Sequence, residues 1–202
     1  MSIIENWSPS KAEYRRGKWR ASRDRKQVHI TSRINADRII AGYEYAIKKY
    51  AKGDLVDLGC GQKPYGGIYS PLVSRSIGVD WESSLHDNRH VDVFSDLNEN
   101  VDLPDDSADT ILCTDVLEHI FNPLRLWDEM ARIARDEAIL IVGVPFFYWL
   151  HEEPHDHHRY TRHALRRYAT EAKFEVVEIW AVGGYPHVFA DLGNPPILDG
   201  AP

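Results

Sequence analysis

The chain has 202 residues, of which 43% are hydrophobic, and its 24 Lys and Arg against 31 Asp and Glu give a net charge of −7. This composition is ordinary for one soluble globular domain with a substantial core. No apolar run reaches about 18 residues, so a membrane-spanning helix is excluded. The first residues resemble no secretory signal, and the two cysteines, Cys60 and Cys113, predict neither a disulfide framework nor a zinc site. We therefore expect a cytoplasmic protein.

The N-terminal part of the chain is strongly basic. Residues 11–38 hold ten Lys and Arg but only three acidic residues. We expect residues 1–31 to form a basic arm or lid, a helical extension of a main domain that spans residues 32–202. Such an arm could meet an anionic substrate, a nucleic acid or the acidic body of its own domain.

Hydrophobic spacing predicts the elements of the main domain in chain order. From Ser32 to Lys52 apolar residues recur every three or four positions, which predicts an amphipathic helix. Short apolar runs then alternate with helical stretches. Strands are predicted at 54–58, 76–80, 90–94, 109–114, 138–144 and 174–182, and helices at 66–74, 122–135 and 162–172. This alternation predicts an α/β fold with a doubly wound, mainly parallel, Rossmann-like sheet.

Only one strand is predicted after the last helix, and the tail beyond it is rich in Pro and Gly. The sheet is therefore expected to keep an exposed edge. A second copy of the chain could cover that edge, so a homodimer is one expected assembly.

The end of the first strand carries the most informative motif. Ligands of an open α/β sheet bind beyond the carboxyl ends of its strands, and there the string VDLGCG places Asp57 before Gly59 and Gly61. The two glycines let the backbone turn sharply and approach a ligand. A nicotinamide or flavin fingerprint requires a small third residue, but Pro64 stands there, which argues against an NAD-dependent oxidoreductase.

The D-x-G-x-G string resembles the first motif of class I S-adenosylmethionine-dependent methyltransferases, although Lys63 replaces a commoner glycine. A second string, VLEHI at 116–120 with LPDDSAD before it, closely resembles the fourth-strand region of the type 11 methyltransferase family. The resemblance spans about residues 54–182. It implies the class I fold, S-adenosylmethionine as the cofactor and S-adenosylhomocysteine as its product.

Side-chain chemistry and this resemblance together predict a cofactor site at the strand ends. Asp57 would favour the ammonium group of the cofactor, Asp80 would accept hydrogen bonds from both ribose hydroxyls, and Trp81 would stack on the adenine. The resemblance assigns the adenine amino group to Asp96, with Asp92 as the competing candidate. The predicted cofactor-binding residues are Asp57, Gly59, Cys60, Gly61, Asp80, Trp81, Asp96, Leu97, Thr114 and Asp115.

The segment after the fifth predicted strand is the candidate for the acceptor chemistry. Methyl transfer to a hydroxyl is helped by a general base, and histidine suits neutral pH. His151 and His155 are the candidate bases, with Asp156 as orienting partner and His119 as runner-up; a nitrogen or carbon acceptor would need no base. The pattern H-x-x-P-x-D-x-x-R-Y-T resembles bacterial methyltransferases, some of them from polysaccharide or natural-product pathways. We therefore expect O-methylation of a small-molecule, glycan or natural-product acceptor.

Three alternatives concern metal, substrate and turnover. The histidines within 151–158 offer metal donors, and Asp115, Glu118 and His119 form an acidic-x-x-Glu-His string that resembles metal-supported ubiquinone-pathway O-methyltransferases. The donors for a closed site are not at a recognised spacing, so no metal is expected. The basic arm makes a nucleic-acid methyltransferase the alternative on substrate, against which stand the acidic overall charge and the lack of a recognisable nucleic-acid module. A non-catalytic regulatory protein that binds S-adenosylmethionine is the alternative without turnover.

Overall fold

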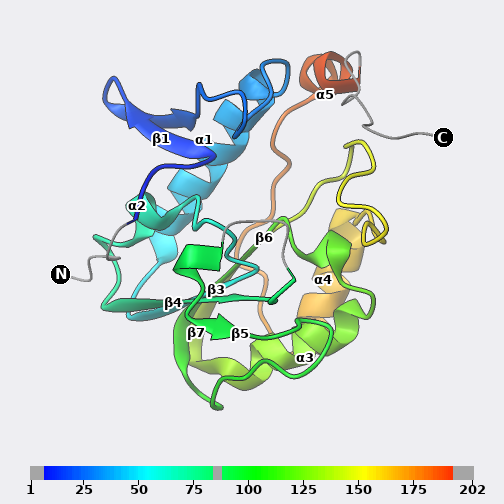
Figure 1. The fold of residues 1–202 in the computed structure, drawn as a ribbon. Coiled ribbons are helices and arrows are strands. Elements are labelled where there is room, and N and C mark those ends of the chain that lie inside the picture. The colour runs from blue at the N-terminus through cyan, green and yellow to red at the C-terminus, as the bar shows by residue number, and fades with distance from the viewer. Residues whose placement is uncertain (1–6, 84–87, 193–202) are drawn as a thin grey trace.

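The computed structural model describes residues 7–83 and 88–192, which Figure 1 shows as a ribbon. Its centre is a sheet of five parallel strands in the order β5-β4-β3-β6-β7. The strands are β3 Asp54–Leu58, β4 Arg75–Asp80, β5 Val93–Phe94, β6 Ala108–Thr114 and β7 Ala134–Gly143. The predicted mainly parallel α/β sheet is confirmed. The strand order reverses between β3 and β6, and such a switch point is where ligands bind in open α/β sheets.

Helices cover both faces of this sheet. They are α1 Arg33–Tyr50, α2 Gly66–Tyr69, α3 Pro123–Ile133, α4 Arg162–Glu171 and α5 Tyr185–Leu192, with the 3-10 turns η1 Asn88–His90 and η2 Leu117–His119. The helix α2 is shorter than the predicted 66–74, because Pro71 lacks the N–H that would continue it. Within the described residues, no helix combines the length and apolar character needed to cross a membrane.

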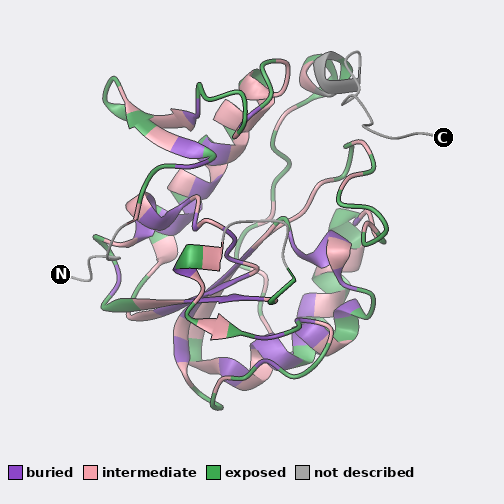
Figure 2. Ribbon diagram, viewed as in Figure 1, coloured by how far each residue is buried: buried purple, intermediate pink, exposed green. Residues whose placement is uncertain are grey.

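Alternate residues of the central strands supply two separate hydrophobic cores. Leu55 of β3 and Leu112 of β6 pack with the buried side of α1. Val56 and Ile111 pack instead on the face covered by α3 and α4. This alternation is the two-residue period of a strand buried on both faces. Figure 2 shows the buried residues concentrated in the sheet and on the helix sides turned toward it.

The N-terminal arm is a β-hairpin, and the predicted helical extension is wrong over the described part of the arm. Strands β1 Ala12–Arg15 and β2 Lys18–Ala21 pair antiparallel. Arg16 and Gly17 join them with φ of 53° and 80°, the combination of a tight type I′ turn. The paired Ala12 and Ala21 are buried in the α1 core, whereas Tyr14, on the same face by the two-residue period, is 61% exposed. Residues 1–6 of the predicted arm lie outside the described residues.

The predicted strand at 174–182 joins no sheet: Phe174 and Val176 pack on the core covered by α3 and α4, and the rest of the segment runs along α1. Lys49 Nζ lies 2.5 Å from Glu178 Oε1, and the rings of Tyr45 and Trp180 meet edge to face at 5.7 Å between centroids. The alternation that suggested a strand therefore reflects packing on a core and on a helix, without strand pairing. In the described part of the chain, the sheet ends at β7, and the tail beyond residue 192 is not described.

Candidate active site

The loop after β3 is held by hydrogen bonds to the end of β4. Gly61 N donates to Asp80 Oδ2 at 2.7 Å, and Trp81 N donates to Asp80 Oδ1 at 2.8 Å. Gly59 has a φ of +65°, and a Cβ there would lie 2.3 Å from Val116 Cγ2, so no side chain fits. One carboxylate therefore ties two strand ends together, and each of its oxygens keeps a further lone pair for a ligand.

The carboxylate of Asp57, a residue of β3, lies near the loop that follows this strand. Its side chain is buried, and Tyr69 Oη donates to its Oδ2 at 3.1 Å. Burial raises the pKa of Asp57 to about 7, although the nearby Lys63 ammonium acts in the opposite direction. A cationic ligand beside this carboxylate would favour its ionised form.

Lys63 has a structural role that the sequence analysis missed. Its side chain is 3% exposed, runs beneath Gly78 and ends 2.7 Å from Asp92 Oδ2. Gly78 N donates to the same oxygen at 2.7 Å. Asp92 therefore holds the loop after β3 through Lys63. Asp96, the first candidate to bind the adenine amino group, lines the cavity, whereas Asp92 does not.

One cavity of about 2440 Å³ lies over the strand ends and continues along β7. All ten predicted cofactor-binding residues line it, and so do His119, His151 and His155. Pockets for single small molecules measure about 300–1,000 Å³. The cavity is larger because it includes the groove between β7 and the segment 173–182 as well as the space over the strand ends.

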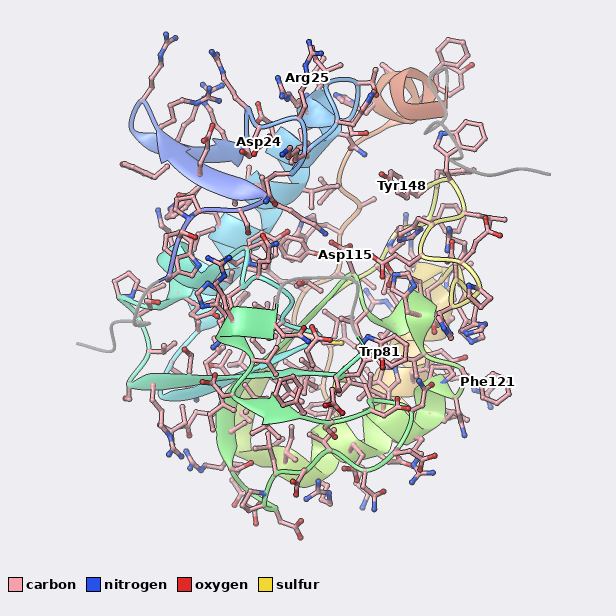
Figure 3. The ribbon with its side chains drawn as sticks, in the orientation of Figure 1. Asp24, Arg25, Trp81, Asp115, Phe121 and Tyr148 are labelled. Carbon is pink, nitrogen blue, oxygen red and sulfur yellow. The ribbon has the colours of Figure 1, made fainter. Side chains whose placement is uncertain are left out.

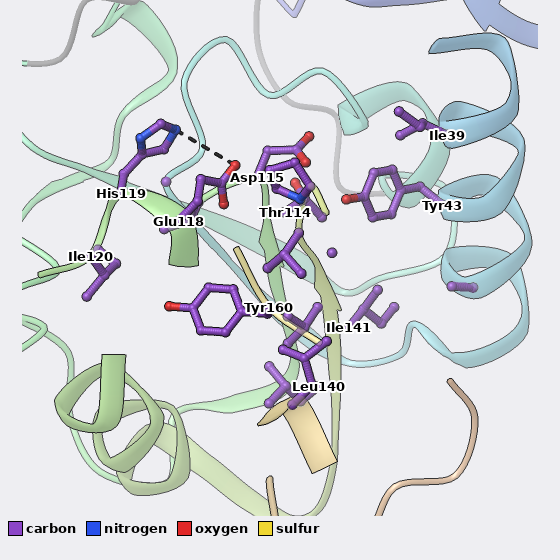
Figure 4. A pocket seen from close by; sticks show the side chains of 18 of the residues that line it. Ile39, Tyr43, Thr114, Asp115, Glu118, His119, Ile120, Leu140, Ile141 and Tyr160 are labelled. Atoms are coloured by element: carbon purple, nitrogen blue, oxygen red, sulfur yellow. Dashed lines mark ion pairs between the residues drawn. The ribbon is translucent and has the colours of Figure 1, made fainter. Parts of the chain in front are cut away.

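Asp115 and Tyr43 form the inner part of this cavity. Asp115 follows β6 with a φ of 54°, and its N donates to Gly143 O at 2.9 Å. Figure 3 shows Asp115 near the middle of the molecule, and Figure 4 shows it between Glu118 and Tyr43 of α1. Asp115 is exposed to the cavity, and the protein atoms that surround the cavity wall desolvate its carboxylate enough to raise its pKa.

Beside Asp115 lies a cluster of one buried carboxylate and two imidazoles. Glu118 Oε1 lies 3.8 Å from His119 Nε2 and 3.9 Å from His151 Nε2. The Glu118 side chain is 0% exposed, and neither of its oxygens has a hydrogen-bond partner in the described part of the chain. Burial, and then repulsion from Asp115, raises the pKa of Glu118 to about 8, while burial lowers the pKa of His119. Figure 4 marks the Glu118–His119 contact.

His151 and Asp156, predicted as base and orienting partner, are in contact. His151 Nδ1 lies 3.2 Å from Asp156 Oδ2, and the His151 backbone N donates to the same oxygen at 3.1 Å. Arg159 Nη2 donates to Asp156 Oδ2 at 2.7 Å. Partial burial acts to raise the pKa of Asp156, but the hydrogen bonds from Arg159 and His151 outweigh it and lower this pKa to about 2. Asp156 is therefore an anion that fixes the imidazole of His151.

His155, the other predicted base, lies elsewhere. Its exposed ring packs edge to face on Trp81 at 5.5 Å between centroids. Only its backbone reaches the cluster, where His155 O lies 3.0 Å from His119 Nδ1. The structure thus places His155 beside the predicted adenine side of the cavity and His151 beside Glu118. The sequence analysis treated Glu118 only as one of several metal donors, because burial without a partner leaves no trace in a motif.

A family model and a curated relative match the chain. The model described as "Methyltransferase domain" matches residues 33–179. A protein of Mycobacterium tuberculosis named "Probable S-adenosylmethionine-dependent methyltransferase" is 29% identical over 109 residues. These residues make up 51% of this chain and 39% of that protein, so the chain matches less than half the length of this curated relative.

Solved structures share the fold at low sequence identity. A SAM-dependent methyltransferase from Archaeoglobus fulgidus superposes with a TM-score of 0.57 at 18% identity, over 77% of this chain and 74% of that one. Another from Aquifex aeolicus gives 0.53 at 20% identity, over 69% and 83%. These likenesses show a Rossmann-like fold.

Proposed function

The chain belongs to the methyltransferase domain family, and we propose that it transfers the methyl group of S-adenosylmethionine to a hydroxyl oxygen of a small-molecule, glycan or natural-product acceptor. Curated relatives are named S-adenosylmethionine-dependent methyltransferases, so S-adenosylmethionine is the cofactor. The observation that supports the proposal best is that all ten predicted cofactor-binding residues line one cavity.

The donors at the strand ends suit this cofactor chemically. When bound, S-adenosylmethionine supplies a methyl carbon that becomes bonded to the acceptor oxygen while the sulfonium becomes a neutral thioether. Asp57 and Asp115 line the cavity with carboxylates, which favour a cationic ligand. Asp80 keeps lone pairs for two hydroxyls, and Gly59 leaves the space that a side chain would fill.

His151 is our candidate for the group that accepts the acceptor's proton. Its Nδ1 faces Asp156 Oδ2 at 3.2 Å and Trp149 O at 3.1 Å, so the ring is held with Nε2 toward Glu118. As the C–O bond forms, the hydroxyl proton would pass to this nitrogen. Asp156 would act as a positioning residue, while His155 would contribute a contact to Trp81 rather than a base.

The basic arm is proposed to close over the bound ligands as a lid. Lys11, directly before β1, and the segment 26–29 line the cavity. The charge of Lys11 acts to lower the pKa of Asp115. The arm therefore faces the inner part of the cavity.

Calorimetry with S-adenosylhomocysteine tests this proposal, with NAD as the control ligand. We expect micromolar or tighter binding of S-adenosylhomocysteine and none of NAD. Asp80→Ala should weaken the binding of S-adenosylhomocysteine at least about tenfold, because hydrogen bonds to a charged group contribute about 1.5–3 kcal/mol. Asp102→Ala is the control variant: it removes an exposed carboxylate outside the cavity lining and should leave the affinity for S-adenosylhomocysteine unchanged. A folded wild-type chain that binds no S-adenosylhomocysteine would contradict the proposal and favour the non-catalytic alternative.

A further inference from the structure

Glu118, His119 and His151 offer three ligand atoms that all lie within 4.8 Å of one another. Two belong to the turn η2 after β6, and the third belongs to the loop after β7. We propose that these three residues bind a divalent first-row transition-metal ion at the inner end of the cavity. The sequence offers Glu118 with His119 and the histidines of 151–158 as two separate groups of donors, and only the structure brings His151 to Glu118 and His119.

The surroundings of the two imidazoles direct one particular nitrogen of each toward the site. His119 Nδ1 lies 3.0 Å from His155 O, an acceptor, so it carries the proton and leaves Nε2 as a lone pair. His151 Nδ1 lies beside Trp149 O and Asp156 Oδ2, which fixes the same tautomer. In metal sites, a carbonyl or carboxylate on the remote nitrogen commonly orients the histidine ligand. Both histidines have that arrangement before any ion is bound.

Glu118 supplies an independent reason to expect a cation. Its carboxylate is fully buried, and neither oxygen has a hydrogen-bond partner in the described part of the chain. Burial of a carboxylate without a partner is costly, so such groups are normally paired or coordinate a metal. The only cation candidates within 4 Å of Glu118 in the described residues are His119 and His151. An ion between the three groups would stabilise the ionised form of Glu118 and would accept the two nitrogen lone pairs.

The donor set indicates which ions fit. Two imidazoles and one carboxylate suit Zn²⁺, Fe²⁺, Co²⁺ or Mn²⁺, whereas Mg²⁺ and Ca²⁺ prefer oxygen ligands alone. Ligands about 2.1 Å from a tetrahedral ion lie about 3.4 Å apart. The observed N–O separations of 3.8 and 3.9 Å require a small contraction, and the two imidazole nitrogens, which lie within 4.8 Å, would have to approach further. Glu152 Oε2, 3.9 Å from His119 Nε2, could provide a further oxygen.

The consequence for catalysis rests on the proposed function. Three protein ligands leave coordination positions open, and these three residues line the cavity in which the acceptor would bind. A hydroxyl oxygen bound there would lose its proton more easily, as water does on a metal ion. His151 would then be a ligand and not the proton acceptor: the ion would lower the pKa of the hydroxyl, and the proton would pass to water in the open cavity.

Titration of the metal-stripped full chain with Co²⁺, followed by its visible absorption and by calorimetry, tests the proposal directly. We expect one Co²⁺ per chain, and weaker binding of Mg²⁺. Glu118→Gln and His151→Gln should each weaken Co²⁺ binding at least about 100-fold, and Asp156→Asn about tenfold through loss of orientation. His157→Gln is the matched control, because His157 lies on the same loop with an exposed ring directed at Phe121.

Binding of S-adenosylhomocysteine to each variant separates this proposal from the proposed function. Glu118→Gln should still bind it, which shows that the fold and the cofactor site are intact. If the wild type binds S-adenosylhomocysteine but no stoichiometric Co²⁺, the metal site is refuted and the methyltransferase proposal is unaffected. Co²⁺ binding that survives in both Glu118→Gln and His151→Gln but weakens in His157→Gln would equally refute it.

Discussion

Asp57 is a carboxylic acid placed inside the fold, and its pKa of about 7 reflects that burial. Lys63 and the Tyr69 hydroxyl offset only part of the effect. Because an unfolded Asp has a pKa of about 3.9, the folded chain favours the protonated form. The contribution of Asp57 to stability is therefore present below about pH 4 and is lost as the pH rises to about 7. A bound ammonium group would reverse this preference.

We expect S-adenosylhomocysteine to bind more tightly as the pH rises from about 5 to about 7, by up to about tenfold per unit, and to level off above. This is because the ligand requires ionised Asp57, and the ionised fraction of Asp57 increases as the pH rises to about 7. Calorimetry across the range measures the slope.

Asp57→Asn is the control for this prediction. It should bind S-adenosylhomocysteine weakly at every pH, without the slope. The ligand-free variant should melt above the wild type at about pH 8, where the wild type holds a buried charge. A slope that persists in Asp57→Asn would assign the titration to another group, such as Asp115.

Gly17 and Gly59 require glycine for different reasons: Gly17 for its backbone conformation alone, and Gly59 for its conformation and for lack of space. Both have positive φ, but a Cβ at Gly17 would meet nothing within 4 Å, whereas one at Gly59 would collide with Val116. We expect Gly17→Ala to cost about 1 kcal/mol and Gly59→Ala about 3 kcal/mol, with loss of cofactor binding only at Gly59. Urea denaturation measures both. Equal costs would mean that Val116 moves aside freely.

At the scale of elements, the hairpin and the segment 26–29 are the parts that the proposed lid would involve. The hairpin is docked on α1 by a hydrogen bond from Ala21 N to Asp37 Oδ1 at 2.7 Å. Trp7 Nε1 donates to Lys63 O at 2.9 Å, which connects the arm with the loop after β3. The arm thus contacts the cofactor loop and α1 simultaneously.

Hydrogen exchange should therefore detect ligand binding in this arm. We expect saturating S-adenosylhomocysteine to slow amide exchange several-fold over residues 18–29. Opening of the arm would break its contacts with the bound ligand, so the ligand makes that opening less favourable. The loop 99–107 lies outside the cavity lining, so its amide exchange should be unchanged. Protection confined to the strand ends, with none in the arm, would argue against a lid.

At the scale of the whole molecule, the candidate site exists only because distant segments meet. The cavity is lined by the arm, by α1, α3, β7 and α4, by the loops after β3, β4, β5, β6 and β7, and by the segment that follows α4. Parallel strands bring their carboxyl ends to one edge, so the five loops converge by topology alone. The arm and the segment after α4 complete the walls by packing on α1.

The sequence by itself determined the parallel sheet, the three long helices and the loops that line the cavity. The spacing of apolar residues indicates which side of a strand or helix is buried. Glycines at the ends of strands indicate where the backbone turns sharply. The prediction was therefore correct where local pattern and tertiary environment agree.

Only the tertiary structure decided the rest. The alternation in 174–182 fits a strand or a segment packed on a core and on a helix, and its contacts with the core covered by α3 and α4 and with α1 decided for the second. The arm folded as a hairpin because Ala12 and Ala21 find a common apolar surface on α1. Lys63 pairs with Asp92 and Glu118 faces two histidines through contacts between loops far apart in the chain. Charge burial and ligand geometry depend on distance in space, which spacing along a sequence does not encode.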